Sequence, residues 1–325
     1  MEAQQTQPTR YIPSSEQMAL ASTVEKSLAA LLPRSRLHTS PEEDAKTWSS
    51  LDEIGIFGIC ISEDQGGSAL GATDEALIVI ELGRHLASPA VLATIGATHA
   101  PQGADAPGLR GRRVAAAYQR GERIILVEDP ATDLMLVRHH SGAALYASVS
   151  SVLRQIDDRL WFARLREAPK PDRPLACFGT TQLLRLRLID AAALSGIAAT
   201  ALEMSVAYAG ARQQFGRPIG SFQAVKHHCA NMAMAARCAR DQTSFAAVAL
   251  DEGRADAALQ VECAFLVAGT AALDNAGKNI QIHGGIGFSE EADPHLVLKR
   301  ARLLITIAGG LEAASGRIAN IKAEW

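Results

Sequence analysis

The sequence has none of the features that mark a membrane-spanning or nucleic-acid-binding protein. No apolar run reaches the roughly 18 residues of a membrane span, and the polar start MEAQQTQPTR is not followed by an apolar signal core. Lysine and arginine number 32 and aspartate and glutamate 35, so the formal net charge of −3 gives neither a basic footprint nor an acidic tail. We therefore expect a cytoplasmic protein with no membrane and no nucleic-acid partner.

Cysteine is also scarce. The five cysteines form no Cys-x-x-Cys pair and lie mostly inside apolar patterns. An odd number without such spacing argues against a disulfide framework and predicts reduced, buried thiols. The histidines show no nucleophile or metal spacing either, so we expect surface or pocket-lining roles and no metal for His139, His140, His227, His228 and His283.

What the 325 residues do contain is three segments of different texture. Residues 1–108 carry helical periodicity, interrupted at Phe57–Gly71 by a short β-prone run and a glycine-rich loop. Residues 109–185 hold short runs separated by Gly, Asp and Pro clusters, which is typical of small antiparallel strands. Residues 186–325 return to helix in four long segments, the fourth beginning at Pro294. The pattern predicts a mainly α fold: an N-terminal helical domain, a small β domain and a C-terminal four-helix bundle.

Two motifs in the third segment could serve a ligand. The first, Arg212–Gln223, reads RQQFGRPIGSFQ, and the second, Gln281–Phe288, reads QIHGGIGF. The glycines of the second permit a close approach of the backbone, but a plain turn between helices would use them as well. It lacks the strand-then-helix context of a dinucleotide fingerprint, and Arg212 alone fits simple stabilisation of a helix end.

Together the two motifs resemble the C-terminal signature of the acyl-CoA dehydrogenases, Arg-x-x-Phe-Gly-x-Pro-Ile-x-x-Phe-Gln followed by Gln-x-x-Gly-Gly-x-Gly-Phe. The N-terminal stretch WSSLDEIGIFGICISEDQGGSALG, Trp48–Gly71, resembles the opening of that family, in which a short strand precedes a Glu-x-x-Gly-Gly loop. The resemblance covers most of the chain and implies the same order of domains, with the β domain shortened.

The resemblance also implies FAD at a subunit interface, with these motifs serving the ADP side of a flavin held mainly by the neighbouring subunit. Arg212 would contact the pyrophosphate, because a guanidinium fork suits phosphate oxygens. Phe215 would pack on the adenosine half, and Gln223 would hydrogen-bond the dinucleotide. The cofactor-binding residues implied in this way are Arg212, Phe215, Phe222, Gln223, Gln281, Gly284 and Gly285.

The other half of the family site departs from the pattern. Family members grip the flavin ring with a Thr-Glu-Pro-x-Ala-Gly-Ser-Asp loop and a Trp-x-(Thr/Ser) strand, and neither occurs here. The nearest string, VEDPATD at Val127–Asp133, has no Gly-Ser turn. The resemblance therefore implies a β domain truncated through its flavin-ring site.

The catalytic base is missing as well. Most of the family carries a Tyr-Glu-Gly-Thr segment whose Glu removes the α-proton, and here Gly309 occupies that position. A minority uses a Glu one residue before an Arg at the start of the first bundle helix, where this chain has Leu186. Glu312 and Asp190 lie nearby in the sequence, but surface or capping roles are favoured, with Asp190 as a helix N-cap.

The favoured interpretation is a non-catalytic subunit of a heteromeric α2β2 acyl-CoA dehydrogenase. Such heterotetramers often act on bulky substrates such as steroid side-chain CoA thioesters, and a full-length partner would bind most of the acyl-CoA. One alternative is a scaffold of the same fold that binds no flavin. The other is an active homo-oligomer with a relocated base, for which Glu312 is the candidate.

Overall fold

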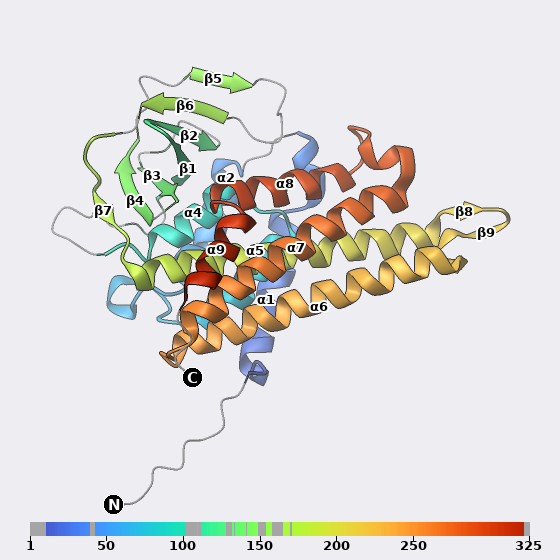
Figure 1. Ribbon diagram of the computed structural model, residues 1–325, viewed down its shortest axis with the longest axis horizontal. Coiled ribbons are helices and arrows are strands. Elements are labelled where there is room, and N and C mark those ends of the chain that lie inside the picture. Colours follow the sequence, from blue (N-terminus) through green and yellow to red (C-terminus); the bar gives the residue numbers. More distant parts are fainter. Residues whose placement is uncertain are drawn as a thin grey trace, which may run out of the picture.

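The structure is a computed structural model, and the residues that it describes are 11–39, 43–101, 109, 112–127, 132, 134–140, 142–148, 154–157, 165–169 and 171–321. Figure 1 shows a group of short helices and a twisted sheet at one end of a set of long helices that run to the opposite end of the molecule. The predicted order of helical part, small sheet and helical bundle is confirmed.

The N-terminal part consists of short helices around an apolar core. Its α-helices are α1 (Ser15–Leu31), α2 (Ala45–Glu53), α3 (Ala72–Arg84) and α4 (Pro89–Ala97), and its 3-10 turns are η1 (Arg34–His38), η2 (Ile56–Gly58) and η3 (Glu63–Gln65). A reciprocal capping box between Ser14 and Gln17 starts α1. All nine residues of α4 are buried, which makes it a central core helix.

The β-prone run expected within Phe57–Gly71 forms no strand, so this prediction is wrong. The segment folds through η2 and η3, and its peptide groups bond within the loop: Ser68 N–H donates to Gly58 O at 2.9 Å and Leu70 N–H to Ile59 O at 2.9 Å. Gly66, at φ +80°, supplies the left-handed turn that folds the loop back on itself. Because the loop satisfies its own backbone groups, it has no need of a partner strand.

The middle part is a seven-stranded sheet in the order β5-β6-β2-β1-β3-β4-β7. Its strands are β1 (Val114–Arg120), β2 (Arg123–Val127), β3 (Leu134–His139), β4 (Gly142–Ala147), β5 (Arg154–Asp157), β6 (Leu165–Pro169) and β7 (Ala176–Cys177). Only the pairing of β1 with β3 is parallel. Alternate residues form two apolar clusters, so the central strands are buried on both faces, and one face packs on α4 and α5. Most of the VEDPATD string lies outside the described residues.

The C-terminal part is a helical bundle. It consists of α5 (Thr180–Ala211), α6 (Gln223–Asp251), α7 (Ala257–His283), α8 (Pro294–Ile307) and α9 (Leu311–Asn320), with the short elements β8 (Gln213–Gln214), β9 (Arg217–Pro218), η4 (Ile219–Ser221) and η5 (Gly284–Phe288). The expected four long helices are confirmed, and the start expected at residue 186 lies inside α5. Close packing of α5 on α3 requires glycine, because a Cβ at Gly196 would stand 2.0 Å from Ile80 O.

Two stretches of this bundle, Thr180–Ala211 and Ala257–Phe288, are long and apolar enough to cross a membrane. Their most apolar windows are 72% and 50% buried inside the fold, as expected for core helices of a bundle. The five cysteines are free, and Cys177 and Cys238 are exposed. The expectation of buried thiols is wrong for these two, which lie on the edge strand β7 and on an outward face of α6, and the other three cysteines are only half-buried.

Candidate functional site

The first predicted motif forms a hairpin between α5 and α6. Strands β8 and β9 pair Gln214 with Arg217, and the two residues between them have positive φ, +52° at Phe215 and +75° at Gly216. Two successive left-handed residues make the tight turn whose twist matches antiparallel strands. In Figure 1 the hairpin projects from the end of the bundle that lies opposite the sheet.

Phe215 at the hairpin tip is unusually placed for an aromatic residue. Its side chain is 92% exposed, and within the described part of the chain its ring contacts only the edge of the Phe222 ring, with centroids 6.1 Å apart. The Arg217 guanidinium lies 4.3 Å from the Phe222 ring centre. A bulky side chain in left-handed backbone and in open solvent is doubly unfavourable, so the geometry presents Phe215 to something outside the chain.

Arg212 caps the C-terminal end of α5. Its backbone N–H and C=O both form hydrogen bonds, whereas its side chain forms none with the described residues. Its N–H donates to Tyr208 O at 2.8 Å, and its carbonyl accepts from Ile219 N–H at 2.8 Å. The guanidinium is exposed and makes no hydrogen bond or ion pair with the described part of the chain. Gln223, the first residue of α6, is also exposed. Both side chains are available to an external ligand.

The second motif turns from α7 into η5. Gln281 is exposed and accepts a hydrogen bond from Lys278 Nζ at 3.0 Å. Gly284 has φ +66°, and a Cβ at Gly284 or Gly285 would meet nothing within 4 Å, so a ligand can approach the backbone there. Gly287 has a packing role instead, because its Cβ would stand 2.7 Å from Ile280 O.

The structure brings both motifs to one end of the bundle. The rings of Tyr208 and His283 stack with centroids 4.1 Å apart, which joins the last turns of α5 and α7. In Figure 1 the η5 turn, between α7 and α8, lies at the same end as the hairpin. The cofactor roles given to these residues remain a prediction.

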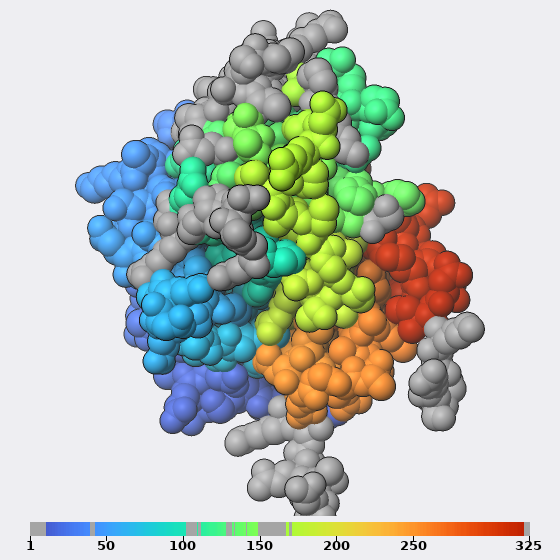
Figure 2. Space-filling model, turned by 90° about the vertical axis from the view of Figure 1, so that its left-hand side faces the viewer, coloured from blue at the N-terminus to red at the C-terminus, as the bar shows by residue number. Residues whose placement is uncertain are grey.

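The two family base positions lie at or beside one pocket, far from that end. Leu186 of α5 and Ala308, which precedes Gly309, line one pocket of about 230 Å³. Gly309 and Gly310 have φ +92° and +88° in the link between α8 and α9, and Leu186 is 2% exposed. Glu312 is exposed in the first turn of α9 and does not line this pocket. Figure 2 shows the side of the molecule where the start of α5 passes between the sheet and the C-terminal helices.

Charged side chains that sequence reasoning missed fill the surroundings of this pocket. Its polar lining includes three arginines, two histidines and one glutamate: Arg138, Arg187, Arg317, His139, His140 and Glu262. Arg317 binds Glu262 through two hydrogen bonds of 2.7 and 3.0 Å. Arg187 donates to the carbonyl of Ala308 and lies 3.7 Å from Glu262. Burial lowers the pKa of Arg187 to about 10, although neighbouring carboxylates act against that shift.

Asp190 belongs to this charged group, and its predicted role as an N-cap is wrong. Helix α5 begins at Thr180, which places Asp190 in the helix interior, where it is 4% exposed. It accepts a hydrogen bond from Arg138 and lies 3.9 Å from Arg187. Burial raises the pKa of Asp190, while the two guanidinium groups oppose the shift. A carboxylate in this position pairs the sheet with the bundle.

The five histidines named in the sequence analysis were expected at the surface or in the lining of a pocket. His139 and His140 line the pocket, and His283 packs on Tyr208 and bonds Asn279 O at 2.8 Å. On α6, His227 is exposed and His228 half-buried. None of these five belongs to the group with metal-ligand geometry found within the described ranges.

Comparisons with known proteins agree with this architecture. The family models "Acyl-CoA dehydrogenase, N-terminal domain" and "Acyl-CoA dehydrogenase, C-terminal domain" match residues 14–102 and 179–321. Acyl-CoA dehydrogenase IpdE2 of Mycobacterium tuberculosis is 31% identical over 290 residues, which cover 87% of this chain and 88% of that protein. The chain belongs to the acyl-CoA dehydrogenase family. The resemblance found in the sequence is thus confirmed, and the cofactor of the family is FAD.

Other similarities extend over different lengths. Acyl-CoA dehydrogenase FadE34 of M. tuberculosis is 32% identical over 313 residues, 85% of this chain but only 42% of FadE34. The ChsE4-ChsE5 complex of M. tuberculosis has the same fold at 21% identity, with a TM-score of 0.76 over 97% of this chain and 100% of that one. The Tcur3481-Tcur3483 steroid acyl-CoA dehydrogenase also shares it at 21% identity, with a TM-score of 0.76 over 94% and 97%.

The hairpin end and the pocket offer different chemical groups. At the hairpin end, an exposed guanidinium and open glycine backbone suit a pyrophosphate and its nucleoside. At the pocket, neither base position carries a carboxylate, and the charged groups there are already paired with one another. The two ends therefore differ in what they can still bind.

Proposed function

We propose that this chain is the non-catalytic subunit of a heteromeric, FAD-dependent acyl-CoA dehydrogenase. In this assembly the hairpin and the η5 turn contribute the ADP-side contacts to a flavin held mainly by a full-length partner subunit. The partner supplies the catalytic base, the flavin-ring site and most of the acyl-CoA site. When bound, FAD would supply the acceptor for the hydride that leaves the substrate β-carbon.

The observation that carries the proposal is the contrast between the two ends of the bundle. At the hairpin end, the Arg212 guanidinium has no ion-pair partner in the described part of the chain, and Phe215 is 92% exposed. Contact with an external ligand or a partner surface would make this arrangement favourable. The retained Gln223 and Gln281 are exposed at the same end. A guanidinium and two amide side chains together suit the polar ADP side of a flavin, which favours the flavin-binding subunit over a scaffold that binds no flavin.

The pocket end supports the non-catalytic part of the proposal. A general base must reach the proton that it removes, and positions 309 and 186 hold glycine and leucine. Glu262, the carboxylate that does line the pocket, is held by two hydrogen bonds from Arg317 and faces Arg187. Both of its oxygens are thus engaged by Arg317, which leaves neither free for a substrate proton.

The relatives support a heteromeric assembly and suggest a substrate class. One structure of the same fold is the ChsE4-ChsE5 complex, and another is described as a steroid acyl-CoA dehydrogenase made of two named chains. We infer an α2β2 assembly that acts on a bulky acyl-CoA of the steroid side-chain type.

Co-expression with a full-length acyl-CoA dehydrogenase encoded beside this chain tests the proposal. The expected product is a complex that co-elutes in gel filtration, shows a flavin absorbance spectrum and oxidises a steroid-type acyl-CoA with an artificial electron acceptor. The chain purified alone serves as the control and should be inactive. Flavin-dependent turnover by the chain alone would contradict the proposal and favour the relocated base.

A further inference from the structure

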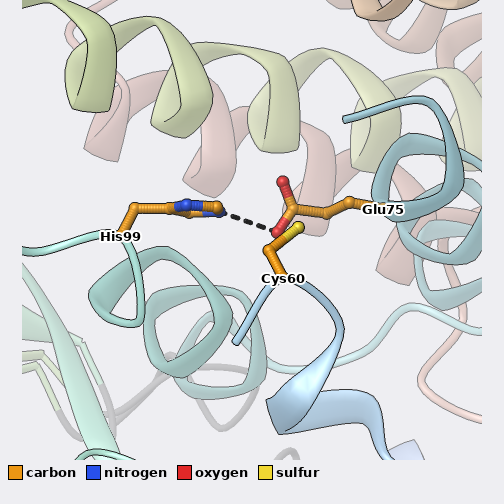
Figure 3. Close-up of side chains that lie close together, drawn as sticks. All are labelled: Cys60, Glu75 and His99. Atoms are coloured by element: carbon orange, nitrogen blue, oxygen red, sulfur yellow. Dashed lines mark hydrogen bonds and ion pairs between the residues drawn. The ribbon is translucent and has the colours of Figure 1, made fainter. Parts of the chain in front are cut away.

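A group of metal-ligand side chains lies in the N-terminal part of the chain, outside the two C-terminal motifs. Figure 3 shows Cys60, Glu75 and His99 pointing toward one another. Cys60 follows η2, Glu75 belongs to the first turn of α3, and His99 follows α4. One ligand atom from each lies within 4.8 Å of the other two, and His99 Nε2 is 2.8 Å from Glu75 Oε1.

Neighbouring contacts fix this group in place. Asp251 of α6 caps the start of α3 by accepting from Ala72 N–H at 2.7 Å and from Thr73 N–H at 2.9 Å, which sets the turn that carries Glu75. The Cys60 thiol lies 3.7 Å from Gly71 O. The three side chains thus converge through contacts that do not depend on a ligand.

The carboxylate of Glu75 is only half satisfied. Glu75 is 1% exposed, and its Oε2 has no hydrogen-bond partner within the described part of the chain. Arg185 Nη1, also buried and without a hydrogen bond there, stands 3.8 Å from this oxygen. The Oε2 atom thus has a long ion pair in place of a hydrogen bond, and it can take up a further cation.

A reactive thiol is a poor explanation of the group. Burial, and next the charge of Glu75, raise the pKa of the Cys60 thiol well above its ordinary value. The thiol is therefore neutral in the free chain and a weak nucleophile. The carboxylate, rather than the imidazole, lies between the other two side chains, which is not the arrangement of a cysteine-histidine pair.

The charges of the group are compatible with a divalent cation. A Cys60 thiolate, Glu75 and Asp251 would carry three negative charges, and Arg185, which lies 3.6 Å from Asp251 Oδ1, carries one positive charge. One divalent ion would therefore leave the metal-loaded group neutral.

We propose that Cys60, Glu75 and His99 form a binding site for a divalent cation of the zinc class. Sulfur, imidazole nitrogen and carboxylate oxygen together are the ligands that Zn²⁺ prefers, and three protein ligands leave the fourth position to water. Ordinary Zn²⁺ distances place tetrahedral ligand atoms about 3.4 Å apart, so the 2.8 Å contact between His99 and Glu75 opens by roughly half an ångström. On binding, the S–H bond breaks, the sulfur–metal bond forms and the proton passes to solvent.

Cobalt(II) titration of the full-length chain tests this site, because a thiolate ligand gives Co²⁺ a charge-transfer band in the near ultraviolet. The expected result is one Co²⁺ per chain with such a band, its displacement by Zn²⁺, and at least a tenfold loss of affinity in Cys60→Ser. A Cys177→Ser, Cys238→Ser double variant removes the exposed thiols and should leave the band unchanged.

The contrary outcomes are equally clear. A band that survives Cys60→Ser, or that disappears in the exposed-thiol variant, assigns the metal to another cysteine and overturns the proposal. Absence of any band at saturating Co²⁺ shows a purely structural cluster. If Cys60→Ser does not fold, as judged by circular dichroism, His99→Gln replaces it and should abolish Co²⁺ binding in the same titration.

Discussion

Tyr208 and His283 stack with ring centroids 4.1 Å apart, although α5 and α7, which carry them, are separated in the chain by the whole of α6. This contact joins the helix ends from which Arg212 and Gln281 project. The two motifs are thereby fixed as one surface at the end of the bundle. Substitutions in either motif would therefore change the affinity of a ligand that contacts both.

Arg212→Ala is expected to reduce the FAD content of the heteromer. Loss of a charge-assisted contact to the pyrophosphate costs about 1.5–3 kcal/mol, or roughly ten- to over a hundredfold in affinity. Gln281→Ala acts in the same direction with a smaller loss, since a neutral hydrogen bond contributes about 0.5–1.5 kcal/mol. The measurement is bound FAD per heteromer after gel filtration.

Arg237→Ala is a matched control for this experiment. Its side chain is 76% exposed on α6 and forms an ion pair with Asp241, so its removal should leave the flavin content unchanged. Full FAD occupancy in a double Arg212→Ala, Gln281→Ala variant that still folds would refute the donated half-site and favour the scaffold interpretation.

Glu312→Gln is expected to leave the turnover of the heteromer unchanged. Glu312 is exposed and does not line the pocket formed by Leu186 and Ala308, so it has no route to a substrate proton there. Steady-state rates of the wild-type and variant complexes decide the point. A drop of about 10²-fold or more, the usual scale of general-base catalysis, would identify Glu312 as a relocated base.

The long helices were predictable because their signals are local. The Asp293-Pro294 pair predicts the start of α8, and α7 ends at His283 as its apolar periodicity predicts. The loop at Phe57–Gly71 was misjudged because β-branched residues favour strands only where a neighbouring strand accepts their hydrogen bonds. Here the glycines let the backbone bond to itself.

The charged pocket could not be predicted, because its members come from distant parts of the chain. Arg138 lies on β3, Asp190 on α5 and Glu262 on α7, and no spacing rule connects them. One local signal was available: Glu262 stands in the buried face of α7 beside Val261 and Phe265. A carboxylate in such a stripe requires a buried cationic partner, and the sequence did not reveal which one.

Acid should destabilise the chain partly through His85. Burial lowers the pKa of this half-buried imidazole below its ordinary value of 6.5, and Arg84, Arg36 and Arg34 add to the effect. A lowered pKa in the folded state means that the related stability is present above about pH 6.5 and is lost as the pH falls through the folded value. His85→Gln should therefore show a smaller drop in Tm between about pH 7.5 and about pH 5.5. If Tm falls by the same amount in His85→Gln as in wild type, His85 is not a source of the acid destabilisation. His227 is exposed, so His227→Gln serves as the control.

Breaking the pair between Asp190 and Arg138 should strongly destabilise the fold. The two side chains are 6% and 11% exposed, so Asp190→Ala leaves the guanidinium groups of Arg138 and Arg187 without their shared carboxylate in a largely dry environment. The cost of removing one partner of a buried pair is about 3–5 kcal/mol, because the remaining charge stays desolvated.

The exposed pair of Arg237 and Asp241, with an N–O distance of 2.7 Å and exposures of 76% and 57%, provides the matched control. Asp241→Ala should cost no more than about 0.5 kcal/mol, the usual value of a surface pair one helical turn apart. Urea unfolding of both variants, followed by circular dichroism, measures the difference. Nearly equal losses would mean that water reaches the Asp190 pocket and screens its charges, and that the ion pairs there do not hold the sheet to the bundle.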